Sequence, residues 1–238
     1  MPTFTLIPGL LSDQIVWEDL AGALFGKGEV HHADLRPYST ISEMARSVLD
    51  QTQGQLIPIG HSMGARAALE IARMAPERVP ALVLADTGMH PLKPGELEKR
   101  EEKIRLGHES MEKLADAWLP PMVSEKHHGD QRLMGALRAM VLRADADQHE
   151  RHLRALIDRP DAARYIPNIK CPVLLVVGDE DQWSPVSQHE EIAALLSDCT
   201  LEVIKGAGHF APIERASHVT SIIASWLEQK NRIANENA

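Results

Sequence analysis

The sequence predicts an α/β fold: a doubly wound, mostly parallel sheet of about six strands, with a helical lid inserted into it. Short apolar runs alternate with longer helical patterns along most of the 238 residues. Several of these runs are continuously apolar, which is typical of strands covered on both faces. The alternation is broken once, by a stretch of about 75 residues that is too long for a structureless loop.

The expected strands are short apolar runs bounded by turn residues. The runs at 82–84 and 173–177 contain no polar residue. Because helical patterns separate most consecutive runs, we expect right-handed crossovers and a wholly parallel sheet. The six strands are predicted at residues 3–8, 29–34, 55–60, 81–86, 172–179 and 200–205.

Helical patterns follow most of these strands. Met44, Val48 and Leu49 recur at helical spacing in one of them, and an Ala-rich segment ends just before Pro76. The helices of the core are predicted at residues 12–24, 42–53, 62–74, 186–196 and 216–229.

The stretch 90–166 is expected to be a helical cap over the sheet. Apolar residues such as Leu114 and Trp118 recur in it at helical intervals, which predicts three or four short helices. The predicted domains are a core, residues 1–89 and 167–238, and the cap, residues 90–166.

Composition and charge disfavour several classes of protein. With 44% hydrophobic residues the chain can bury an ordinary core, and a net charge of −9 disfavours nucleic acid as a partner. No run approaches the roughly 20 apolar residues that span a bilayer. The opening MPTFTLIPGLL lacks the features of a signal peptide, and Cys171 and Cys199 are expected to be reduced, partly buried thiols. We therefore expect a cytoplasmic protein without membrane partners.

Ser62 is the candidate nucleophile. It lies in Gly-His-Ser-Met-Gly at 60–64, between a predicted strand and a predicted helix. Glycines on both sides allow a sharp turn that lifts the serine hydroxyl at the start of the helix. The alternative is that Ser62 only caps the helix, since serine is a preferred N-cap.

His209 is the candidate base among 12 histidines. It follows the last strand and two glycines, which places it at the sheet edge where ligands bind in such folds. His61 is next to the candidate nucleophile and is a candidate for lining the site, but its side chain is expected to point elsewhere at the turn. His149 and His152 are expected to lie on the surface of a charged helix. The candidate acid is Asp181, beyond the end of the fifth strand, with Asp179 as the alternative.

Two backbone donors are expected to bind the oxyanion that forms during acyl transfer. One is the N–H of Met63, the residue after the candidate nucleophile. The other is the N–H of Leu10, or of Leu11, in the loop after the first strand, which Gly9 allows to bend toward the site.

These motifs together resemble the α/β-hydrolase superfamily over nearly the whole chain, in particular small bacterial esterases grouped with pimeloyl-carrier-protein methyl esterases and lactonases. The order Ser62, Asp181, His209 is that of the superfamily. Pro8-Gly9 stands where many members have His-Gly, and an initial β-hairpin is missing. The segments that carry the resemblance are PGLLSD at 8–13, DLRP at 34–37, GHSMG at 60–64, APERVPALVLADT at 75–87, GDEDQWSP at 178–185 and GAGHFAPIE at 206–214.

The resemblance implies hydrolysis of a carboxylic ester or lactone through an acyl-enzyme on Ser62, with no metal and no organic cofactor. A C–C bond hydrolase or lyase with the same triad, and a non-catalytic ligand-binding member of the fold, are the alternatives. The partner is expected to be a small ester-type substrate, and the protein a monomer or homodimer.

The substrate pocket is expected between the sheet edge and the cap. No basic cluster stands beside the motifs in the sequence, which disfavours strongly anionic substrates. The residues predicted to line the pocket are Leu10, Leu11, Trp17, Met89, Trp118, Met122, Trp183 and Phe210.

Overall fold

The computed structural model describes the backbone of residues 2–236 and the side chains of residues 2–230. Its centre is a sheet of six strands in the order β2-β1-β3-β4-β5-β6, and every neighbouring pair is parallel. The predicted fold class and the wholly parallel sheet are confirmed. The strands are β1 (Thr3–Ile7), β2 (Val30–His32), β3 (Leu56–His61), β4 (Leu82–Ala85), β5 (Val173–Gly178) and β6 (Cys199–Ile204).

The four central strands are buried along their whole length, whereas the edge strands β2 and β6 are partly exposed. Helices cover both faces of the sheet, which explains why β4 and β5 are apolar without alternation. Cys171 and Cys199 are free, partly buried thiols beside this region.

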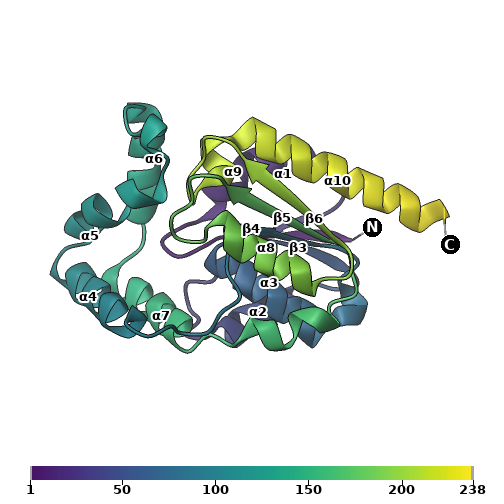
Figure 1. The fold of residues 1–238 in the computed structure, drawn as a ribbon, viewed down its shortest axis with the longest axis horizontal. Helices are drawn as coiled ribbons and strands as arrows, with labels where there is room; N and C mark the ends of the chain where they lie inside the picture. The colour runs from purple at the N-terminus through teal and green to yellow at the C-terminus, as the bar shows by residue number, and fades with distance from the viewer. Residues whose placement is uncertain (1, 237–238) are drawn as a thin grey trace.

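Two layers of helices flank the sheet (Figure 1): α1 and α10 on one face, and α2, α3 and α8 on the other. The direction of the right-handed crossovers reverses after β2, so α1 lies on the opposite face from α2, α3 and α8. The predicted helix at 12–24 is a 3-10 turn, η1 (Gln14–Trp17), followed by a short α-helix. The helices are α1 (Glu18–Leu24), α2 (Ile41–Gln51), α3 (Met63–Met74), α8 (Val186–Leu195), α9 (Ala211–Glu214) and α10 (Ala216–Glu236).

Between β4 and β5 the chain forms helices, and none of its described residues there is in a strand. We refer to residues 90–166 as the cap. It lies at the end of the sheet opposite the N-terminus, which is where the carboxyl ends of the strands lie (Figure 1). Its helices are α4 (Glu96–Glu109), α5 (Met111–Trp118), η3 (Pro120–Met122), η4 (Glu125–His127), α6 (Gln131–Val141), α7 (Ala146–Ile157) and η5 (Ala162–Arg164).

The predicted surface positions of His149 and His152 are wrong. Both side chains are buried, with 1% and 3% of their surface exposed. His152 Nε2–H donates to the Leu35 carbonyl at 3.0 Å, so this face of α7 packs on the core rather than facing solvent. None of the helices among the described residues is both long and apolar enough to cross a membrane.

Candidate active site

Ser62 lies in a strained turn between β3 and α3. Its φ of 53° and ψ of −113° are uncommon for a residue with a side chain. The turn is held from both sides, because Ser62 N–H donates to the Ala85 carbonyl at 2.9 Å and the Thr87 hydroxyl donates to the Ser62 carbonyl at 3.0 Å. Ser62 makes no side-chain capping bond to the helix, which removes the main support for the helix-cap alternative.

Gly64 allows this turn to pack directly against the end of β1. A Cβ atom at Gly64 would lie 2.3 Å from the Ile7 carbonyl oxygen and 2.4 Å from that of Pro8. Both distances are far inside van der Waals contact, so a side chain cannot fit without moving the backbone.

The structure brings Ser62, His209 and Asp181 into one hydrogen-bonded chain. Ser62 Oγ lies 2.8 Å from His209 Nε2, and His209 Nδ1 lies 2.8 Å from Asp181 Oδ2. With Nδ1–H donating to the carboxylate, Nε2 is free to accept the serine proton. The three residues come from three different loops at the carboxyl ends of the strands.

Asp181 is held as a charged carboxylate. Burial opposes its ionisation, but His209 and the backbone N–H groups of Ser184 and Trp183 outweigh it, and the pKa of Asp181 is below its ordinary value. Those two N–H groups donate to Oδ1 at 2.9 and 2.8 Å. The alternative acid, Asp179, instead accepts from the Gly206 N–H at 2.7 Å.

A second buried carboxyl group, Asp86, lies at the end of β4. Its Oδ1 accepts from the Gly178 N–H at 3.0 Å, and its Oδ2 lies 3.8 Å from His61 Nε2. Burial, reinforced by the charge of Asp181, raises its pKa well above the ordinary value. The negative charge behind His209 therefore resides on Asp181.

The loop after β1 lies against the candidate nucleophile. A Cβ atom at Gly9 would be 3.1 Å from Ser62 Cβ and 2.9 Å from His61 Nδ1. Among the described residues, neither the Leu10 N–H nor the Met63 N–H donates a hydrogen bond to another group. Both donors therefore remain available for a ligand.

Sequence reasoning missed the role of His61, which does not point away from the site. Its ring stacks on Phe210 with centroids 5.3 Å apart, and its Nε2–H donates to the His209 carbonyl at 2.7 Å. Burial, followed by the nearby His209, lowers the pKa of His61 to about 3, so the ring is neutral. It positions the segment that carries His209.

Glu214 is a second residue that sequence reasoning missed. Its buried carboxyl group accepts from the N–H groups of Gly208, Phe210 and Ser124, at 2.9, 3.2 and 2.8 Å. Burial raises its pKa. Since Ser124 belongs to the cap, Glu214 ties the cap to the loop of His209. Its place in GAGHFAPIE, four residues after Phe210, was the only signal in the sequence.

A cavity of about 20 Å³ adjoins Ser62 and His209. Its lining contains five of the predicted pocket residues together with His61, Arg100 and Leu156, which were not predicted. The five are Leu10, Trp118, Met122, Trp183 and Phe210.

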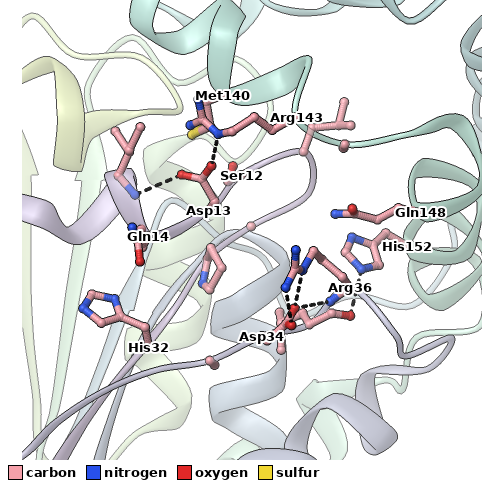
Figure 2. Close-up of a pocket in the computed structure, with 17 residues that line it drawn as sticks. Ser12, Asp13, Gln14, His32, Asp34, Arg36, Met140, Arg143, Gln148 and His152 are labelled. Carbon is pink, nitrogen blue, oxygen red and sulfur yellow. Dashed lines mark hydrogen bonds and ion pairs between the residues drawn. The ribbon is translucent and has the colours of Figure 1, made fainter.

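Three predicted pocket residues lie elsewhere. Trp17 is buried in the core, where its indole N–H donates to the Ile7 carbonyl at 3.2 Å, and the Met89 carbonyl accepts from the Ala162 N–H. Leu11 has a φ of 54° and lines a different cavity, of about 390 Å³, between the loop after β1 and the cap. Figure 2 shows that cavity, into which Asp34, Arg36 and Arg143 project.

The expectation that no basic cluster lies beside the site is also wrong. A third cavity, of about 230 Å³, is lined by Ser62 and by four lysine and arginine side chains against one carboxylate. These residues come from three separate segments, around positions 66, 93–100 and 159, and folding brings the segments together. Among the described residues, no group of three or more His, Cys, Asp or Glu side chains could hold a metal ion.

Several known proteins are similar to this chain. The sequence model of the alpha/beta hydrolase family matches residues 4–220. The chain is 25% identical over 252 residues to the sn-1-specific diacylglycerol lipase ABHD11 of Xenopus laevis, across 95% of this chain and 80% of that protein.

Solved structures agree with this match. A thermophilic esterase from Thermogutta terrifontis has a TM-score of 0.86 at 26% identity, over 97% of this chain and 90% of that one. The enol-lactonase from Burkholderia xenovorans LB400 has a TM-score of 0.83 at 23% identity, over 95% of this chain and 91% of that one. Since the family model covers most of the chain and the observed sheet and cap agree with it, this protein belongs to the alpha/beta hydrolase family.

Proposed function

We propose that this protein is a serine hydrolase that cleaves a carboxylic ester or lactone through an acyl-enzyme on Ser62. The observation that carries the proposal is the hydrogen-bonded chain from Ser62 through His209 to Asp181, with 2.8 Å at both steps. A free serine hydroxyl is a weak nucleophile, and an adjacent histidine oriented by a carboxylate activates it. The names esterase and lipase, borne by two of the similar proteins, support this reaction class.

In the proposed reaction, Ser62 Oγ attacks the ester carbonyl while His209 Nε2 takes its proton. The N–H groups of Met63 and Leu10 stabilise the tetrahedral oxyanion, with Leu11 as the alternative to Leu10. The alcohol then leaves with the proton from His209. A water molecule attacks the acyl-enzyme by the same route and releases the carboxylic acid and free Ser62.

The apolar cavity beside Ser62 is proposed to hold one end of the substrate. At about 20 Å³ it has room for little more than a water-sized group as it stands. Larger substrates would require its wall to move. Trp183 is the wall residue that can move most easily, because it lines the cavity while 43% of its own surface is exposed.

The test is hydrolysis of p-nitrophenyl acetate by the native protein, by Ser62→Ala, and by Ser221→Ala, an exposed serine on α10 that serves as a control. We expect Ser62→Ala to lower the rate by at least about a thousandfold. A fluorophosphonate probe should add its mass once to the native protein and to Ser221→Ala, but not to Ser62→Ala. If native protein and Ser62→Ala hydrolysed a panel of short esters equally slowly, the proposal would fail.

A further inference from the structure

The cavity of about 230 Å³ beside Ser62 is lined by an excess of positively charged side chains. Four basic side chains line it, but Glu96 is its single carboxylate. The four are Arg66, Lys93, Arg100 and Arg159. This basic cavity shares Ser62, Arg100, Leu156 and Trp183 with the small apolar cavity, so the two spaces meet at the candidate nucleophile.

Glu96 is already bound by two of the arginines. Arg100 donates from Nε and Nη2 to Glu96 Oε1, at 2.9 and 2.6 Å, and Arg159 Nη2 donates to Oε2 at 2.7 Å. Burial opposes the charge on Glu96, but these hydrogen bonds outweigh it and lower its pKa to about 2. The remaining groups of Arg159 donate to backbone carbonyls, so Arg159 is a structural residue.

Arg66 has no carboxylate partner among the described residues. Its guanidinium makes one hydrogen bond there, from Nη1 to the His90 carbonyl at 3.2 Å. Burial, together with the charges of Arg159 and Arg100, lowers its pKa to about 9, so it is still charged at neutral pH. A partly buried guanidinium without a directly bonded carboxylate is unfavourable, and an anion in the cavity would relieve it.

Arg66 is well placed relative to Ser62. It lies four residues later, on the first turn of α3, and its backbone N–H donates to the Ser62 carbonyl at 3.3 Å. Both residues line the basic cavity. A substrate held at Ser62 could therefore place a second functional group, a few bonds from its ester, against the guanidinium.

We propose that Arg66, assisted by Arg100, binds an anionic group of the substrate, and that the preferred substrates are esters bearing a carboxylate. The proposal rests on the ester hydrolysis proposed above and names its substrate class. A guanidinium matches a carboxylate in both charge and geometry, since its paired N–H groups can donate to both oxygens. Arg100 would add hydrogen bonds from Nη1, the guanidinium nitrogen that does not donate to Glu96.

The test compares charged and neutral esters of matched shape. Mono-4-nitrophenyl adipate and 4-nitrophenyl hexanoate differ in a carboxylate on the acyl part. 4-Acetoxybenzoate and its methyl ester differ in a carboxylate on the alcohol part. We expect the native protein to show a higher kcat/KM for the charged member of at least one pair.

Variants assign the preference to Arg66. In Arg66→Gln, the charged-to-neutral ratio of kcat/KM should fall roughly 10- to 100-fold, the effect of losing a hydrogen bond to a charged group. Arg164→Gln, on an arginine with 84% of its side chain exposed, should leave the ratio unchanged. A fall of both rates by the same factor in Arg66→Gln would overturn the proposal, because Arg66 would then act on the turn of Ser62 rather than on the anion.

A binding measurement separates this proposal from ester hydrolysis itself. Calorimetry with adipate should detect binding to Ser62→Ala, and at least about tenfold weaker binding once Arg66→Gln is added. If no ester were hydrolysed while adipate bound through Arg66, the esterase proposal would fail and the anion site would stand. If neutral esters were hydrolysed through Ser62 while charged ones were neither preferred nor bound, the anion site would be refuted.

Discussion

Replacing Gly64 with alanine should separate the turn of Ser62 from the loop that is proposed to bind the oxyanion. The added Cβ would lie 2.3 Å from the Ile7 carbonyl oxygen and 2.4 Å from the Pro8 carbonyl oxygen, whereas ordinary contact begins near 3.4 Å. Both neighbours are backbone atoms at the end of β1, so no side chain can rotate to make room. The loop that carries Gly9 and Leu10 must therefore retreat by about 1 Å.

A displacement of this size at a catalytic centre can lower the rate by about a hundredfold. Overpacking of this kind destabilises a protein by about 1–3 kcal/mol, and each kcal/mol lowers Tm by about 2–4 °C in a chain of this length. We expect Gly64→Ala to lose about two orders of magnitude in kcat for p-nitrophenyl acetate and several degrees in Tm. The drop in kcat should exceed what partial unfolding at the assay temperature explains.

Gly22 provides the matched control. It lies within α1, and a Cβ there would meet nothing within 4 Å. Gly22→Ala should keep the native rate and be neutral or stabilising by about 0.5–1 kcal/mol. Native activity and native Tm in Gly64→Ala would refute the reasoning, because they would show that the loop does not depend on this contact.

Two further predictions concern carboxylates. Asp181→Asn should lower kcat/KM for p-nitrophenyl acetate by about 10³- to 10⁴-fold, because Asp181 orients His209. Asp179→Asn should lower it far less. Equal losses in the two variants would contradict the assignment of Asp181, rather than Asp179, as the acid. The pKa of Glu96 is depressed from 4.5 to about 2, so its contribution to stability is complete above pH 4.5 and is lost as the pH falls through 2. Urea unfolding should find Glu96→Gln less stable by on the order of 1 kcal/mol at pH 7, after allowance for the exposure of Glu96 to solvent, and the difference should narrow steadily below pH 4.5. A difference that is independent of pH would contradict this account of the bonds from Arg100 and Arg159.

Local sequence patterns determine much of the core. Uninterrupted apolar runs identify the buried strands, because a strand covered on both faces has no solvated side to carry polar residues. The segment Gly-His-Ser-Met-Gly locates the turn of Ser62, because glycines are required wherever backbones approach closely. In both cases the signal lies within a few consecutive residues.

The choice between Asp181 and Asp179 is not local in this sense. Both follow the same strand, and the sequence favours Asp181 only by its distance past the strand end. In the structure the direction of the side chain decides the matter, since Asp181 faces His209 while Asp179 accepts a hydrogen bond from the Gly206 N–H. Likewise, the sequence groups Leu11 with Leu10, but the positive φ of Leu11 places it in the lining of a different cavity.

The sequence by itself therefore determined the parallel sheet, and it predicted the order of the candidate triad and the position of the cap. Tertiary structure alone decided the character of the space around Ser62. Arg66 looks like an ordinary helix residue in the sequence, and Arg100 and Glu96 look like part of a solvated charged helix. Packing of the cap on the core brings them together around one cavity, where Glu96 bridges Arg100 and Arg159 and leaves Arg66 without a carboxylate partner among the described residues. Such a balance depends on contacts between segments far apart in the chain, and no pattern of neighbouring residues encodes it.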